Sequence, residues 1–108
     1  THLGLQVMKA SAEPPYAHFL ADADGRIMLE IYSNPEAPIT DFAALDPLSF
    51  HVAFAVKDAE WGKKQLIAAG ASLVVDQHLE DGSHIVMLRD PWQVPFQLCH
   101  RADPFITP

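Results

Sequence analysis

The sequence is short of cysteine, of basic residues and of long apolar runs, and each shortage excludes a class of protein. Cys99 is the single cysteine, so no disulfide can form within the chain, which suits a reducing compartment and predicts a cytoplasmic protein. Seven Lys and Arg stand against 14 Asp and Glu, for a net charge of −7, and no basic run occurs. We therefore expect neither nucleic acid nor an anionic membrane surface as a partner. No apolar run approaches the ~20 residues that span a bilayer.

The composition that remains is that of an ordinary globular domain. A chain of 108 residues has room for one domain with a modest core, and 49% hydrophobic residues are too many for disorder. In the first half, extended and alternating patterns predict strands over residues 3–8, 16–21 and 26–32, with a tight turn at Asp24 and Gly25. Residues 33–47 include three prolines and predict a long connection with one short helical turn.

The second half carries a different order of elements. Residues 49–56 alternate large and small side chains and predict a strand. Asp58 is suited to cap a helix that runs to Gly70, whose lack of a side chain suits the left-handed position after a helix. Residues 71–77, 83–89 and 95–100 predict three more strands, followed by a tail at 102–108. The order is strand, helix, strand, strand, strand.

The first half matches only the last three strands of that order. Residues 26–32 (RIMLEIY) end the first half much as residues 94–100 (VPFQLCH) end the second, so Glu30 corresponds to Gln97. With the same offset, the counterpart of His51 would fall before residue 1. The expectation is a repeat whose first copy lacks its opening strand and helix.

Four segments resemble the vicinal oxygen chelate superfamily, which includes glyoxalase I, antibiotic-binding resistance proteins and extradiol dioxygenases. HVAFAVKD at 51–58 is similar to the family's opening strand with its metal-binding histidine, and LIAAGA at 66–71 to the end of its helix. RDPWQVPFQL at 89–98 resembles the closing segment and last strand, with Gln93 where glycine is usual. IMLEI at 27–31 resembles the closing strand of a first module.

The resemblance implies an α+β glyoxalase/bleomycin-resistance fold of paired βαβββ modules, with the first module truncated to three strands. Residues 1–108 would be a single glyoxalase-like domain. Residues 1–34 would form the partial first module, 35–48 a linker, 49–101 the complete second module and 102–108 a tail. In the family, two modules make a cupped surface that holds a divalent metal. The implied ligands are Glu30, His51 and Gln97, the implied metal is Ni, Zn, Mn or Fe, and Glu30 is the implied catalytic base.

The residues themselves weigh for and against this site. The face of the predicted strand opposite His51 carries Phe and Val, so His51 should point into the cup, although a lone strand histidine is more often a hydrogen-bonded structural residue. Glu30 lies among apolar strand residues, where a carboxylate is costly to bury unless it is paired or binds a cation. The alternative is that its face is open to water. Gln97 departs from the family, because an amide cannot accept a proton at neutral pH.

The other candidates carry weaker signals. The remaining histidines show no zinc-like spacing with one another, and each is expected at the surface or in a turn: His2, His18, His78, His84 and His100. The predicted pocket walls are Met28, Tyr32, Ala53, Trp92 and Cys99. We expect Cys99 to serve in packing rather than as a reactive thiol.

Three functions stay open at this point. The first is a metal-dependent lyase or isomerase of the glyoxalase type, acting on a small oxygenated molecule as substrate. The second is a metal-free module that binds a small molecule or an antibiotic, which the amide of Gln97 favours. The third is a truncated, inactive family member. A sheet that lacks its first strand exposes an unpaired edge, so a homodimer is also expected.

Overall fold

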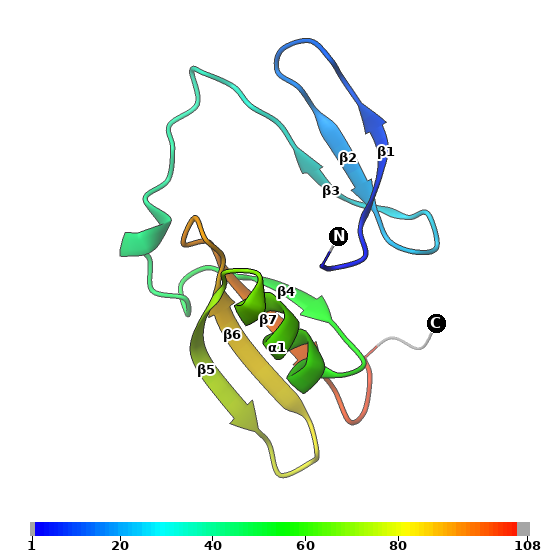
Figure 1. Cartoon of the computed structure of the whole chain (residues 1–108), viewed down its shortest axis with the longest axis vertical. Helices are drawn as coiled ribbons and strands as arrows, with labels where there is room; N and C mark the ends of the chain where they lie inside the picture. Colours follow the sequence, from blue (N-terminus) through cyan, green and yellow to red (C-terminus); the bar gives the residue numbers. More distant parts are fainter. Residues whose placement is uncertain (1, 106–108) are drawn as a thin grey trace. The chain divides into compact units, whose positions relative to one another are not determined.

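The computed structural model describes residues 2–105, which divide into two compact units: unit 1 up to residue 40 and unit 2 from residue 41. Each unit has its own sheet: three strands in unit 1, and four strands with a helix in unit 2 (Figure 1). The strands of the two units together with the helix of unit 2 make this an α+β protein. Within the described residues, no helix is long and apolar enough to cross a membrane.

Unit 1 is an antiparallel sheet in the order β1-β2-β3. Its strands are β1 (Gln6–Ala10), β2 (His18–Ala21) and β3 (Ile27–Ile31). The turn between β2 and β3 closes at Asp22, whose carboxylate accepts hydrogen bonds from the Asp24 and Arg26 amides, while Gly25 takes a φ of +79°. The predicted strand at 3–8 is displaced to Gln6–Ala10, because Gly4 with its φ of +70° interrupts the extended chain.

Unit 2 is a sheet in the order β4-β7-β6-β5, preceded by a short 3₁₀ turn, η1 (Phe42–Ala44). The strands are β4 (Val52–Ala55), β5 (Ser72–His78), β6 (His84–Arg89) and β7 (Pro95–His100), and the helix is α1 (Ala59–Ala68). The first and last strands of this unit, β4 and β7, pair in parallel. β6 pairs antiparallel with both β5 and β7. The element order β4-α1-β5-β6-β7 agrees with the predicted second module.

The helix begins and ends where the sequence predicts. The Asp58 carboxylate accepts a hydrogen bond from the Trp61 amide at 2.9 Å, and Gly70 follows the helix with a φ of +111°. A β-carbon on Gly62 would lie 2.9 Å from Leu98 Cδ1, so the absence of a side chain lets α1 approach β7 closely. Across this contact lies the core of unit 2, which contains Ala59, Leu66, Val86, Leu88, Phe96 and Leu98.

Alternation then divides the sheet of unit 2 into two faces. Val86, Leu88, Phe96 and Leu98 point toward α1, so the intervening residues Ile85, Met87, Gln97 and Cys99 lie on the opposite face, which we call the open face. Figure 1 shows α1 lying along one side of this sheet. The open face is where the candidate site lies.

Candidate functional site

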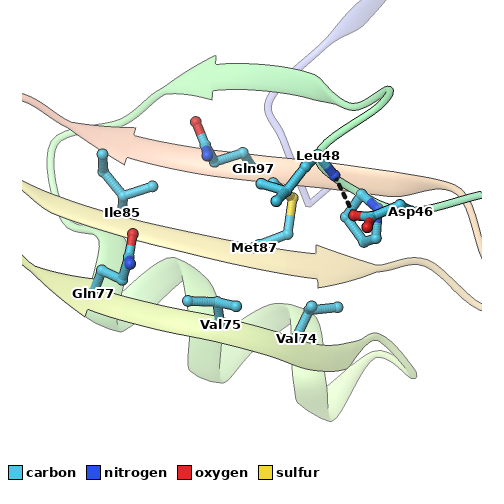
Figure 2. Close-up of a pocket in the computed structure, with 9 residues that line it drawn as sticks. Asp46, Leu48, Val74, Val75, Gln77, Ile85, Met87 and Gln97 are labelled. Carbon is cyan, nitrogen blue, oxygen red and sulfur yellow. Dashed lines mark hydrogen bonds between the residues drawn. The ribbon is translucent and has the colours of Figure 1, made fainter.

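A cavity of about 340 Å³ lies on the open face of unit 2. Three strands and the loop before β4 supply its lining, as Figure 2 shows: Asp46, Pro47, Leu48, Val74, Val75, Gln77, Ile85, Met87 and Gln97. Most of these side chains are apolar, and the polar groups are the Asp46 carboxylate and the two amides of Gln77 and Gln97. Ligand sites have this character, with apolar walls and a few polar groups that orient the ligand.

A bulge in β5 widens the apolar wall of the cavity. Leu73 pairs with Leu88 and Val75 pairs with Met87, so Val74 is the extra residue between them. Both Val74 and Val75 line the cavity, which strict alternation would not allow. Simple alternation along residues 71–77 therefore does not predict that Val74 and Val75 face the same cavity.

The fourth wall is a loop that the Arg89 guanidinium holds against the sheet. Its Nη1 donates to the Phe42 carbonyl at 2.8 Å, and its Nη2 donates to the Leu45 carbonyl at 2.6 Å. Nη1 also donates to the Gln93 carbonyl at 2.9 Å. Within the loop, the Asp46 carboxylate accepts the Leu48 amide at 2.8 Å, as the dashed line in Figure 2 marks. Arg89 thus positions the loop that carries three of the lining residues.

His51 lies just before β4 rather than inside the strand that we predicted over residues 49–56. The half-buried ring donates from Nδ1 to the Pro47 carbonyl at 2.7 Å, and Pro47 itself lines the cavity. A carbonyl can only accept, so Nδ1 carries the proton and Nε2 of the neutral ring is a free acceptor. Metal-binding histidines are commonly held in this way, with one nitrogen bonded to a carbonyl and the other facing the ion.

Gln97 lies on β7 with its amide inside the cavity. It pairs with Ala53 on β4 and with Met87 on β6. Cys99 lies on the same face and donates from Sγ to Gln97 Oε1 at 2.7 Å. Burial raises the pKa of the Cys99 thiol, so it stays protonated at neutral pH and serves as a donor. One lone pair of Gln97 Oε1 remains for a ligand or an ion.

Of the predicted site residues, Gln97 lines the cavity, whereas His51 and the others lie outside its lining or in unit 1. Ala53 is exposed on β4, and Trp92 is exposed in the turn between β6 and β7; neither lines the cavity, nor does Cys99. In unit 1, Glu30 is exposed on β3 opposite Phe19, and Met28 and Tyr32 are also exposed. Their assignment to a metal site or a pocket wall stays a prediction.

Three histidines that we expected at the surface or in a turn lie instead in strands and are at least partly buried: His18 on β2, His84 on β6 and His100 on β7. We expected His84 at the surface or in a turn, but it is buried on β6, only 7% exposed. The cause is its partner: His84 Nε2 donates to the Asp76 carboxylate at 2.6 Å across the β5–β6 hairpin. That pairing satisfies the polar atom that burial would otherwise strand.

Comparison with known proteins finds similarity in structure alone. No protein-family model and no curated protein matches the sequence. Among solved structures, a glyoxalase family protein from Bacillus cereus matches with a TM-score of 0.70 and 19% identity, over 92% of this chain and 79% of that one. A lactoylglutathione lyase from Agrobacterium tumefaciens matches with a TM-score of 0.61 and 20% identity, over 94% and 78%. A bleomycin-binding protein, solved with bleomycin, matches with a TM-score of 0.54 and 21% identity, over 93% and 82%.

These neighbours agree with the architecture of the two units. Unit 2 has the strand, helix and three strands of one complete module, and the described part of unit 1 has three strands and no helix. At about 20% identity the likeness shows the fold and does not assign a substrate. The chain therefore has the glyoxalase/bleomycin-resistance fold, as its resemblance to the vicinal oxygen chelate superfamily predicted.

Proposed function

We propose that the open face of unit 2 binds a small oxygenated molecule and that the protein is a divalent-metal-dependent lyase or isomerase of the glyoxalase type. The observation that carries the proposal is the cavity of about 340 Å³ with apolar walls and three polar side chains. Its size is near the lower end of small-molecule sites, about 300–1,000 Å³. A compact ligand with one apolar part and one or two oxygens matches this lining.

Two donors of the type that a divalent metal takes, Gln97 in the cavity lining and His51 bonded to the lining residue Pro47, support the metal. His51 offers Nε2, because Nδ1 is committed to the Pro47 carbonyl. Gln97 offers an amide oxygen, which is a weaker ligand than a carboxylate. Glu30 remains the predicted third ligand and base; it belongs to unit 1, and its role is tested separately below. Nickel, zinc, manganese or iron would suit a site of imidazole and oxygen donors.

A metal held here would polarise a carbonyl oxygen and stabilise negative charge on it. The protein's own groups would do the rest: the apolar wall excludes water, Gln77 and Gln97 orient the ligand, and a carboxylate moves the proton. Two carboxylates are candidates, the predicted Glu30 and the Asp46 that lines the cavity. The lactoylglutathione lyase and glyoxalase neighbours support this reaction class for the chain.

The test measures metal binding: the metal-stripped full chain is titrated with Ni²⁺, Zn²⁺ and Mn²⁺ in an isothermal titration calorimeter. We expect a binding event that His51→Gln weakens at least tenfold and that Gln97→Ala weakens less. Glu30→Gln and Asp46→Asn, measured in parallel, separate the two carboxylates. A wild-type protein with no event that depends on His51 would contradict the metal-dependent function.

A metal-free binding module is the second candidate, favoured by two observations. Gln97 is an amide whose oxygen already accepts the Cys99 thiol, and the chain carries a net charge of −7, which attracts cationic ligands. One neighbour was solved as a complex with bleomycin. Titration of the metal-stripped protein with bleomycin tests this: binding unaffected by His51→Gln supports the module, and no binding counts against it.

A homodimer is also proposed, from the edges of the unit 1 sheet. β1 and β3 are its outer strands, and Val7, Ile27 and Ile31 on them are each more than half exposed. An unpaired strand edge is a place where another chain can pair, and exposed apolar residues favour such a contact. Light scattering at micromolar concentration should give twice the monomer mass, and a monomer there would contradict the proposal.

A further inference from the structure

A second group of metal-ligating side chains lies on the other side of the unit 2 sheet, at the junction between α1 and the β5–β6 hairpin. Glu60 from α1, Asp76 and His78 from β5 and His84 from β6 each bring one ligand atom to within 4.8 Å of the others. Asp76 pairs with the core residue Val86, so the group lies on the face that carries α1. None of these residues lines the open-face cavity.

The two oxygens of Asp76 have different partners. Oδ2 accepts from Lys63 Nζ at 2.6 Å, and Lys63 also lies 2.8 Å from Glu60 Oε2. Oδ1 faces two imidazoles, with His84 Nε2 at 2.6 Å and His78 Nε2 at 3.8 Å. The hydrogen bond from Lys63 and then that from His84 lower the pKa of Asp76, so its carboxylate is ionised at neutral pH.

The histidines are neighbours because of strand register. His78 and His84 are directly paired across the hairpin, and their rings stack with centroids 3.9 Å apart. His84 and Asp76 are sheltered, with 10% and 21% of their side chains exposed, whereas the His78 side chain is 71% exposed. One half of the group, His84 and Asp76, is thus sheltered, and the other, His78, is open to solvent.

We propose that Asp76 Oδ1, His78 Nε2 and His84 Nε2 form a binding site for a transition-metal ion such as Zn²⁺, with Glu60 available as a fourth ligand. On binding, the proton that His84 Nε2 donates to Asp76 in the metal-free protein leaves Nε2, and the neutral ring keeps its proton on Nδ1. Two imidazoles and a carboxylate are a ligand set that zinc prefers. Lys63 orients Asp76 through the other oxygen, Oδ2, as outer partners of metal ligands commonly do. The ion would fasten the β5–β6 hairpin to α1 and so stabilise the unit.

The competing interpretation is that Lys63 alone supplies the positive charge and the group is an ion-pair network. The two interpretations differ at Asp76 Oδ1. A network needs only Lys63 between Glu60 and Asp76, and it gives no role to His78, whose Nε2 is beyond hydrogen-bond distance of Oδ1. A metal site needs both imidazoles. Loss of His78 therefore separates the interpretations: it removes the ring that stacks on His84 and leaves the bond between His84 and Asp76 in place.

In the experiment, the metal-stripped full chain is titrated with Co²⁺, and binding is monitored by the visible absorption of the bound Co²⁺. Zn²⁺ is then added to displace the Co²⁺. The variants are His78→Gln, which is exposed and should fold normally, and His84→Gln, which removes the buried ligand. His51→Gln and His100→Gln are the controls. His100 is the partner of His84 on β7, and its Nδ1 lies 3.4 Å from the Val56 carbonyl, outside the group.

We expect a Co²⁺ spectrum that Zn²⁺ abolishes and a Zn²⁺ affinity that His78→Gln lowers at least tenfold, with His51→Gln and His100→Gln leaving this event unchanged. Wild-type protein without a displaceable spectrum, or a His78→Gln protein that binds as wild type does, would overturn the proposal. If His51→Gln alone removes the only event, the metal lies on the open face and this second site is refuted. Absence of the site at Asp76 would thus leave the proposed function of the open face intact, and absence of metal binding at His51 would leave the site at Asp76 intact.

Discussion

Replacing Arg89 with Met tests how the cavity wall is held. Met retains most of the apolar length of the side chain and removes the donors to the Phe42 and Leu45 carbonyls. Hydrogen bonds from charged groups contribute about 1.5–3 kcal/mol each when sheltered. Arg89 is only half-buried and water can replace part of each bond, so we expect the two together to hold the loop by about 2 kcal/mol.

A loss of that size should appear first in the loop and not in the core. A decrease of about 2 kcal/mol in the free energy of opening the loop corresponds to roughly a 30-fold rise in its opening equilibrium constant. Hydrogen exchange of the Leu45 and Leu48 amides, which are bonded within the loop, should accelerate by about that factor in Arg89→Met. Affinity for any ligand of the open face should fall with it.

The control is Arg26→Met in unit 1, which removes a guanidinium that is bonded to Asp22 and Asp24 at an exposed turn. We expect this variant to leave exchange in the loop unchanged. Unchanged exchange at Leu48 in Arg89→Met would refute the reasoning, because the wall would then be held by something other than the guanidinium.

Three further predictions concern the unit 2 core and its charges. Leu98→Ala removes a side chain that is 1% exposed and should lower the free energy of unfolding by about 2–5 kcal/mol in urea melts. Gly62→Ala should lower it by about 1–2 kcal/mol, because the clash with Leu98 outweighs the better helix propensity; a gain in stability would contradict the close contact. Hydrogen bonds from Lys63 and then His84 lower the pKa of Asp76, so its contribution to stability is present above about pH 5 and is lost as the pH falls through that lowered pKa. Asp76→Asn should flatten the acid side of the stability profile measured by urea melts between pH 2 and 7.

The order of elements could be predicted because it depends on local signals. Asp58 and Gly70 mark the two ends of α1, and Gly25 and Gly82 take positive φ in the hairpin turns. The bounds of β1 could not be predicted by apolar pattern, because Gly4 interrupts a run that is otherwise suited to a strand. Local chemistry therefore decides which elements form more reliably than where each one begins.

The cavity could be predicted only in part, since it depends on contacts between residues far apart in the chain. Gln97 was identified from the repeat, but Val74 lines the cavity because of a bulge that no periodicity reveals. Arg89 recruits the Asp46 loop through carbonyls 44 and 47 positions away, and backbone carbonyls leave no trace in side-chain patterns. His51 leaves its predicted strand for the same kind of reason, a bond to the Pro47 carbonyl.

The group around Asp76 had a signal that spacing motifs do not register. The turn signal at Asp81 and Gly82 brings His78 near His84, but the exact pairing depends on where the turn is centred. Centred on Asp81, as in the structure, the hairpin pairs His78 with His84; centred between Asp81 and Gly82, it would pair His78 with Ile85. Burial of His84 could not be foreseen in the same way, because it requires α1 to bring Lys63 against Asp76 from another layer. The hairpin itself is readable from the sequence, whereas its exact register and the packing between layers are not.

The central claim is that His51 presents a free Nε2 to a ligand of the open face. Nitrogen NMR of the imidazole rings, recorded during titration of the metal-stripped protein with Zn²⁺, tests this directly because each ring is followed separately. We predict that His51 Nε2 shifts on binding while Nδ1 keeps its proton and its bond to the Pro47 carbonyl. A His51 ring whose two nitrogens do not respond at saturating Zn²⁺ would contradict the account.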